Sequence, residues 1–245
     1  MSPRVTAAVV VRVLSQLRRD PRTIALVVAV PCLLMTLVKF MFEDQVGTFE
    51  RIGPPMLGLF PLIIMFLITS ITMLRERTSG TLERLMTMPM AKLDLLAGYG
   101  IAFAALAALQ AAVTTTFAYL VLDLETQGSG LAVAVLAVSN AVLGTALGLF
   151  LSAFARTEFQ AVQFMPAFIL PQILLCGLLV PREQMADWLD TLAGALPFTY
   201  AYDALVKAAA AATFEGRFVL DVGVVIGATL LALALGAATL PRRTT

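Results

Sequence analysis

Apolar residues fill six stretches of this chain, and the segments between them carry most of the charged residues. A helix needs about 20 apolar residues to cross the hydrocarbon core of a membrane. We therefore expect six transmembrane helices, at about residues 23–42, 52–74, 95–120, 131–154, 159–180 and 219–240. The first contains Lys39, which lies near its end and can extend to the membrane surface.

Residues 1–22 show a helical pattern with an apolar half and a basic half. At about 100° per residue, the apolar half holds Val5, Val9, Val10, Val13, Leu14 and Leu17, and the basic half holds Arg4, Arg12, Arg18 and Arg19. Asp20 and Pro21 then end the helix. This pattern favours an amphipathic helix at the headgroup boundary. The alternative is a frayed basic tail.

The segment between the last two stretches, residues 181–218, shows a second amphipathic pattern. One helix face would hold Met185, Trp188, Leu189, Leu192 and Leu196. We expect Pro197 to end that helix and a second short helix to follow at about 199–213. Trp188, Tyr200 and Tyr202 are typical of a membrane interface, so both helices are expected to dip into the outer leaflet.

Composition agrees with a membrane protein. The 245 residues are 60% hydrophobic and 13% charged, whereas a soluble domain has about 25% charged residues. The net charge of +1 gives no indication of a nucleic-acid partner. Cys32 and Cys176 lie in apolar stretches, where we expect small packing residues rather than a disulfide.

The distribution of Lys and Arg predicts the orientation. With the N-terminus inside, the inner segments hold 12 of the 17 basic residues, and the outer segments hold Lys39, Arg51, Arg182, Lys207 and Arg217. Acidic residues show the opposite bias. Six crossings then return the C-terminus to the cytoplasm, so both termini are expected there.

The sequence carries no motif of an enzyme that would consume ATP. The dipeptide Gly-Lys of a phosphate-binding loop is absent, and so is a G-x-S-x-G motif. Histidine is absent as well, so no cluster of metal ligands is expected other than one of carboxylates. No acidic residue lies near the centre of a predicted span, which disfavours an ion-coupled carrier. We expect no catalytic, metal or cofactor site in this chain, so energy for transport would come from a partner.

The loop between the second and third stretches reads RERTSGTLERLMTMPMAK, residues 75–92. Leu82, Leu85 and Met86 fall on one face of a short helix, which Ser79 or Thr81 could cap and Pro89 would stop. Such a helix could insert into a groove of a soluble partner. An ordinary charged turn explains the same residues equally well.

This loop resembles the cytoplasmic-loop signature of the ABC-2 family of ATP-binding-cassette transporter permeases. The matching positions are Arg75, Glu76, Gly80, Thr81, Glu83, Leu85, Pro89, Leu95 and Gly98. A second stretch, LVPREQMADWLDTLAGALPFTYAYDAL, resembles the family pattern before the last span. There the matching positions are Pro181, Trp188, Pro197, Thr199, Tyr200, Asp203 and Leu205. Two departures are Tyr99, where Lys is common, and Val206, where Arg is usual.

The resemblance implies an all-α polytopic membrane protein with residues 1–22 as an interfacial helix and 23–245 as the transmembrane domain. It also implies a coupling helix between spans two and three and two re-entrant outer helices before span six. A second permease chain, most simply a homodimer, and two ATPase subunits that bind ATP and Mg would complete the complex. Within the family, the chain is most similar to the daunorubicin-resistance type of drug exporter permease, in the plasma membrane of a bacterium.

The resemblance places the ATPase-coupling residues in and beside the loop. They are Arg75, Glu76, Arg77, Gly80, Thr81, Leu82, Glu83, Arg84 and Leu85. The charges would pair with the ATPase surface, Leu82 and Leu85 would fill its groove, and Gly80 would allow a tight turn.

Aromatic and amide residues in spans two and five are candidates for a substrate path. They are Phe60, Phe66, Thr69, Thr72, Gln163, Phe164, Phe168 and Gln172. The alternative is that they pack against lipid or bond neighbouring helices, which is also the expectation for Gln110 and Asn140.

Two functions remain open from the sequence. One is the permease subunit of an exporter for an amphipathic or hydrophobic drug, antibiotic or lipid-like substrate. The other is a membrane scaffold, sensor or immunity protein that uses the same fold without transporting anything.

Overall fold

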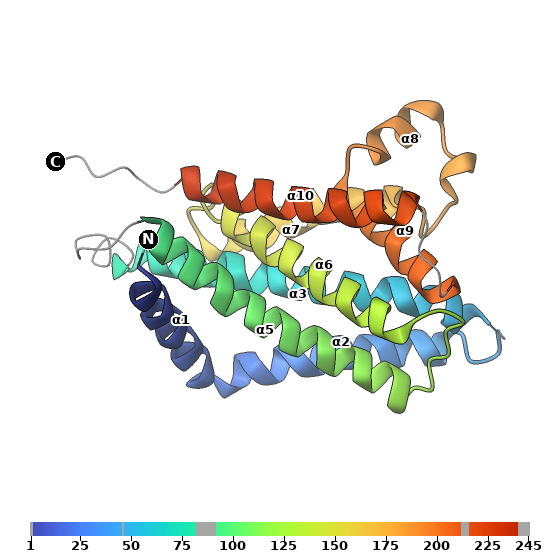
Figure 1. Ribbon diagram of the computed structural model, residues 1–245, viewed down its shortest axis with the longest axis horizontal. Coiled ribbons are helices and arrows are strands. Elements are labelled where there is room, and N and C mark those ends of the chain that lie inside the picture. Colours follow the sequence, from blue (N-terminus) through green and yellow to red (C-terminus); the bar gives the residue numbers. More distant parts are fainter. Residues whose placement is uncertain (1, 46, 82–91, 212–215, 240–245) are drawn as a thin grey trace.

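The computed structural model describes residues 2–45, 47–81, 92–211 and 216–239. In these residues the fold is all-helical (Figure 1). The helices are α1 (Pro3–Arg18), α2 (Pro21–Met41), α3 (Thr48–Thr78), α5 (Lys92–Leu120), α6 (Gly130–Leu151), α7 (Glu158–Leu175), the 3₁₀ helix η1 (Arg182–Gln184), α8 (Asp187–Ala193), α9 (Pro197–Ala210) and α10 (Arg217–Ala238).

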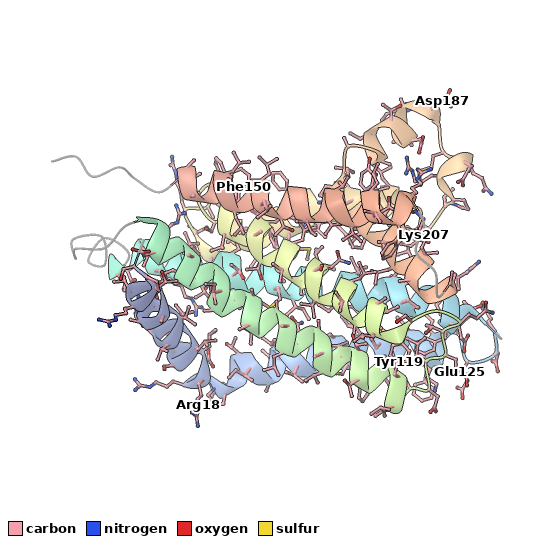
Figure 2. The ribbon with its side chains drawn as sticks, viewed as in Figure 1. Arg18, Tyr119, Glu125, Phe150, Asp187 and Lys207 are labelled. Atoms are coloured by element: carbon pink, nitrogen blue, oxygen red, sulfur yellow. The ribbon has the colours of Figure 1, made fainter. Side chains whose placement is uncertain are left out.

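The long helices run side by side and define two ends of a bundle (Figure 1). We call one the α1 end: it holds α1, the last turns of α3 and α10, and the first turns of α5 and α7. We call the other the α9 end: it holds α8, α9 and the α2–α3 and α5–α6 connections. Charged side chains mark both ends, with Arg18 at the first and Glu125 and Asp187 at the second (Figure 2).

Polar side chains and prolines fix several helix starts. Asp20 accepts a hydrogen bond from the backbone N–H of Thr23, 3.2 Å away, and Pro21 is the first residue of α2. Thr157 caps α7 through the N–H of Gln160. A side-chain oxygen at the N-cap satisfies a backbone donor that the helix leaves free. The break expected at Asp20 and Pro21 is confirmed.

Five helices are long and apolar enough to cross a membrane: α2, α3, α5, α6 and α10. The chain is a multi-pass membrane protein. The sixth expected span corresponds to α7, which has 18 residues and contains Pro166 and Pro171. This helix is not among the five, so its crossing stays a prediction.

The central helices are buried by the chain itself, whereas the outer ones are not. The most apolar windows of α3 and α6 are 61% buried, and those of α2 and α10 only 17%. The close α3–α6 crossing depends on Gly144 and Gly148. A Cβ at Gly144 would collide with the carbonyl oxygen of Leu62, and one at Gly148 would lie 2.6 Å from that of Phe66. Small residues spaced in this way let two membrane helices approach closely.

Three boundaries differ from those expected. The helix α3 continues to Thr78, so Arg75–Arg77 lie in its last turn rather than in a loop. Basic residues are favourable there because of the helix dipole. Met185 precedes α8, which ends at Ala193, and Pro197 opens α9 instead of ending the helix before it. Proline fits the first helical turn because no N–H is needed there.

Candidate functional site

The predicted coupling residues that the structure describes lie at the α1 end, where α3 finishes. Arg75, Glu76 and Arg77 are in the last turn of α3. Gly80 follows with a φ of +69°, a backbone conformation that glycine adopts freely, and nothing lies within 4 Å of where its Cβ would be. The predicted coupling residues Leu82, Glu83, Arg84 and Leu85 lie outside the described residues.

Glu76 is buried and faces the interior of the chain. Its two carboxylate oxygens accept hydrogen bonds from Nη2 of Arg12 at 3.0 and 3.1 Å. Nη1 of Arg12 donates to the hydroxyl of buried Tyr99 at 3.3 Å. We call these three residues the Arg12 node: it joins α1, α3 and α5 in one set of charge-assisted hydrogen bonds.

Packing of α1 explains why Arg12 reaches Glu76. Val9, Val13 and Leu17 form the buried stripe of α1, and Arg12 borders that stripe. Gly98 lets α1 approach α5, because a Cβ there would collide with the side chain of Val9. Arg12 lies outside the buried stripe, as the helical wheel predicts, but its guanidinium turns to the carboxylate of Glu76, a partner that the wheel could not predict.

A second contact ties the start of α1 to the start of α5. The carboxylate of Asp94 is buried and accepts hydrogen bonds from the backbone N–H of Ser2 at 2.9 Å and from the hydroxyl of Thr6 at 3.3 Å. A carboxylate is favourable at a helix N-terminus because the helix dipole is positive there. The N-terminal helix is thus fixed to α5 at both its first turn and its middle.

Arg75 makes the third connection of the α1 end, and it is exposed. Its Nε and Nη2 donate to the two oxygens of Glu158 at 2.8 and 3.0 Å, which ties the end of α3 to the start of α7. An open hollow of about 450 Å³ lies beside this pair. It is lined by Arg12, Gln16, Arg75, Glu76, Thr78, Ser79, Thr81 and Glu158.

Arg77 is left without a hydrogen bond for its buried Nε among the described residues. A buried donor without an acceptor costs about 1–3 kcal/mol. Of the predicted coupling charges, Arg75 and Glu76 form ion pairs within the chain, whereas no ion pair of Arg77 is seen among the described residues.

The predicted path residues fall into two groups. In α3, Phe66 and Thr69 are fully buried against α6, beside Gly148, and Phe60 and Thr72 are half-buried. In α7, Gln163 and Phe168 are exposed and Phe164 is half-buried. The structure brings no common path together from these residues within one chain.

Gln172 bonds two helices together, as the alternative reading of the path residues expects. Its amide Nε2 donates to the carbonyl of Phe168 at 2.9 Å, and its Oε1 accepts from the backbone N–H of Phe198 in α9 at 3.3 Å. For Gln110 and Asn140, which are buried, this role is not seen: both amide atoms of Gln110 and Nδ2 of Asn140 lack a hydrogen bond among the described residues.

Sequence reasoning missed Arg12, Tyr99, Asp94 and Glu158 as parts of this site. A signal was present for Glu158, which lies in the stretch ARTEFQA, between the fourth and fifth apolar stretches. For Asp94 and Tyr99, the sequence offered one indication of a role in this site: both lie near the start of a predicted span, next to the signature loop.

Comparison with known proteins gives the family context of this site. A family model described as "ABC-2 type transporter" matches residues 4–209. The chain is 27% identical over 156 residues to "ABC transporter G family member 20" of Dictyostelium discoideum, which covers 64% of this chain and 21% of that protein. It is also 27% identical over 153 residues to "Probable multidrug ABC transporter permease YbhR" of Escherichia coli (strain K12), covering 61% and 41%. The chain thus matches less than half the length of each of these relatives.

Proposed function

The chain belongs to the ABC-2 type transporter family, as its membrane permease part, and from this premise we propose that it exports an amphipathic or hydrophobic substrate. The observation that carries the proposal is the family match across residues 4–209. Similarity to a permease whose name includes "multidrug" supports the substrate class. A separate ATPase that binds ATP and Mg would supply the energy.

The proposed topology has six crossings and both termini in the cytoplasm of a bacterial cell. Two observations support it. The first turn of α7 lies at the α1 end while α8 and α9 lie at the other (Figure 1), so α7 extends along the bundle. The inner segments of this topology hold most of the Lys and Arg residues, as expected for cytoplasmic segments.

Labelling with a membrane-impermeant maleimide tests the topology and the sixth crossing together. Cys32 and Cys176 would first be replaced by alanine, and single cysteines then introduced at Thr81 and Asp187. We expect the cysteine at 187 to react in intact cells and that at 81 to react only after permeabilisation. If α7 does not cross, both positions lie on the same side, and equal reactivity at the two sites would exclude the proposed topology.

The Arg12 node suggests how a push from the ATPase reaches the spans. Residues 79–91 begin one turn after Glu76, and Glu76 is bonded to α1 and faces α5 through Tyr99. A force on this loop would therefore move the ends of three helices as one unit. We propose that two such chains and two ATPases form the complex, and that the symmetric pair is the simplest arrangement.

Co-purification and transport assays with the ATPase from the adjacent reading frame test the function. The variant Glu83→Arg reverses a charge in the predicted coupling segment, and Glu125→Arg makes the same change at the exposed α9 end. We expect Glu83→Arg to lose ATPase binding and ATP-driven uptake of an amphipathic dye into inverted vesicles, and Glu125→Arg to keep both. Full coupling in Glu83→Arg would exclude the assigned coupling segment. A wild-type complex that binds the ATPase but moves no amphipathic dye would favour the scaffold alternative.

A further inference from the structure

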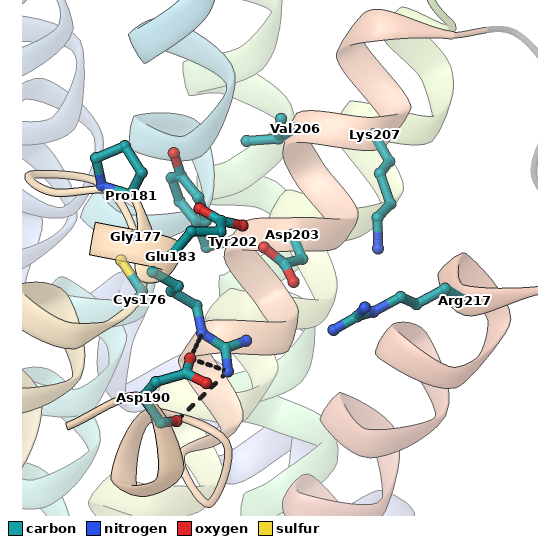
Figure 3. Close-up of a pocket in the computed structure, with 11 residues that line it drawn as sticks. Cys176, Gly177, Pro181, Glu183, Asp190, Tyr202, Asp203, Val206, Lys207 and Arg217 are labelled. Carbon is teal, nitrogen blue, oxygen red and sulfur yellow. Dashed lines mark hydrogen bonds and ion pairs between the residues drawn. The ribbon is translucent and has the colours of Figure 1, made fainter. Parts of the chain in front are cut away.

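A cavity of about 510 Å³ opens at the α9 end (Figure 3), whereas α1 lies at the other end of the bundle (Figure 1). The cavity lies among the end of α7, η1, α8, α9 and the first turn of α10. Its charged lining residues are Arg182, Glu183, Asp190, Asp203, Lys207 and Arg217. The second family-like motif, residues 179–205, supplies part of this wall, and the proposed function gives that motif no role.

Two ion pairs neutralise Arg182 and Lys207. Nη2 of Arg182 lies 2.6 Å from Oδ1 of Asp190, and its Nε donates to the same oxygen at 2.7 Å. The ammonium of Lys207 pairs with Asp221, whose side chain is fully buried. The first pair joins η1 to α8 and the second joins α9 to α10, so they hold the cavity walls together.

Glu183, Asp203 and Arg217 have no ion pair among the described residues. Glu183 and Arg217 are exposed, Asp203 is half-buried, and both Asp203 and Arg217 point into the cavity (Figure 3). The side chains of Asp203 and Arg217 make no hydrogen bond or salt bridge with any residue in the part of the chain that the structure describes. Burial raises the pKa of Asp203, and the nearby Asp221 adds to the rise, whereas Lys207, Arg182 and Arg217 oppose it. A half-buried carboxylate without a hydrogen-bond partner is unfavourable, so a cationic donor from outside the chain would stabilise it.

Exposed apolar residues are sequence neighbours of two residues that line the cavity. Leu179 and Val180 immediately precede Pro181 in its wall, and Val219 and Leu220 follow Arg217 by two and three positions. A ligand with a separated cation and anion on an apolar body would match the half-buried carboxylate of Asp203, the guanidinium of Arg217 and the exposed apolar residues beside them.

We propose that the cavity binds the headgroup of a zwitterionic phospholipid, with the ammonium at Asp203 and the phosphate at Arg217. Arginine suits the phosphate because its planar guanidinium can donate two parallel hydrogen bonds. The acyl chains would lie along the exposed apolar residues beside the cavity. The phosphate of a purely anionic lipid could bind Arg217, but such a lipid has no ammonium group to pair with Asp203.

Native mass spectrometry of the purified protein without nucleotide or ATPase tests this proposal independently of transport. The probes are phosphatidylethanolamine, phosphatidylglycerol and soluble phosphoethanolamine. We expect the wild type to bind phosphatidylethanolamine at least tenfold more tightly than phosphatidylglycerol. Asp203→Asn should remove this preference, and Arg217→Gln should weaken phosphatidylethanolamine binding at least tenfold.

Conservative and matched variants separate a binding defect from misfolding. Arg217→Lys keeps the charge and should bind within a few fold of the wild type. Asp187→Asn and Arg51→Gln remove exposed charges at the same end and should change nothing. The absence of a preference in the wild type, or its survival in Asp203→Asn, would overturn the proposal. Phosphoethanolamine binding as tight as that of the lipid would overturn the assignment to a lipid.

Discussion

The two ends of the bundle use charged side chains in different ways. At the α1 end, hydrogen bonds join residues far apart in the chain: Arg12 and Glu76 are 64 positions apart, and Ser2 and Asp94 are 92. Because these contacts connect α1, α3 and α5, any displacement of one helix end must move the other two or break a buried bond.

At the α9 end, the two ion pairs beside the cavity are local, whereas the salt bridge between Lys39 and Asp123, at 3.7 Å, joins α2 to the α5–α6 connection and includes an aspartate side chain that is 81% exposed. Arg182 and Asp190 are 8 positions apart, and Lys207 and Asp221 are 14. They join η1 to α8 and α9 to the start of α10, and they leave Glu183, Asp203 and Arg217 in the cavity wall without an ion pair among the described residues. The comparison suggests that one end is built to transmit a movement through the chain and the other to meet something outside it.

The α3–α6 crossing connects the two ends, and a change there should destabilise the protein most. Gly144→Ala should lower the free energy of unfolding by about 1–3 kcal/mol, because the new methyl group collides with the backbone of α3. Thermal unfolding in detergent measures the change. The control is Gly227→Ala in α10, where nothing lies within 4 Å of the new Cβ. That substitution should be neutral or stabilising by up to about 1 kcal/mol, and equal effects of the two variants would show that the crossing is not tight.

The Arg12 node should come next in size. Arg12→Met leaves the buried carboxylate of Glu76 without its partner. Breaking a fully buried ion pair costs about 3–5 kcal/mol, and we expect about 1–3 kcal/mol here because the Arg12 side chain is 32% exposed. The double variant Arg12→Met with Glu76→Leu should recover most of that stability.

Stimulation of ATP hydrolysis, measured in the double variant, distinguishes a role of the Arg12 node in transmitting movement from its contribution to stability. If the double variant is stable and binds the ATPase but no longer stimulates ATP hydrolysis, the node transmits the movement. Normal stimulation of ATP hydrolysis in that variant would mean that transmission at the α1 end does not need the ion pair. The Arg12 node would then contribute to stability alone.

Hydrophobic periodicity predicted where the helices lie, because burial in lipid or in the chain depends on long apolar stretches. It could not predict which side chains meet across helices. Arg12 borders the buried stripe of α1 and turns inward only because Glu76 and Tyr99 lie opposite. The first residues of α9 were misassigned for a related reason: Pro197 can either end a helix or open one, and the choice depends on where α9 packs.

The path residues show the same limit of sequence reasoning. Gln163 and Gln172 occupy one predicted span and have the same side chain, so composition gave them the same role. In the structure Gln163 is exposed, whereas Gln172 is buried and bonded to the backbone of α9. The difference arises from the neighbouring helix and not from α7 itself.

Gln172→Met tests the hydrogen bond between α7 and α9 at the α9 end. It removes the acceptor for the buried N–H of Phe198 while it keeps the side-chain volume, so we expect a loss of about 1–3 kcal/mol. Gln163→Met, the matched change at an exposed position, should alter thermal unfolding by less than about 0.5 kcal/mol. A changed substrate profile with unchanged stability in Gln172→Met would instead place this residue on a substrate path.

We expect the smallest effect for the ion pair of Arg75 and Glu158. It shows how burial, rather than charge, determines the strength of an ion pair at the α1 end. Arg75 is the sequence neighbour of Glu76, and both residues form ion pairs with 2.8–3.0 Å contacts. The side chains of Arg75 and Glu158 are 63% and 53% exposed, however, whereas that of Glu76 is only 5% exposed. Exposed pairs contribute about 0.2–1 kcal/mol, so Glu158→Gln should lower the free energy of unfolding by no more than that.

Salt provides the decisive test of this difference. At about 1 M salt the screening length falls to about 3 Å, so the effect of Glu158→Gln should disappear, while the effect of Arg12→Met should persist because the Glu76 carboxylate is shielded from the solvent. Equal salt sensitivity of the two variants would mean that Glu76 is open to water, and a rigid connection among α1, α3 and α5 could not then depend on its burial.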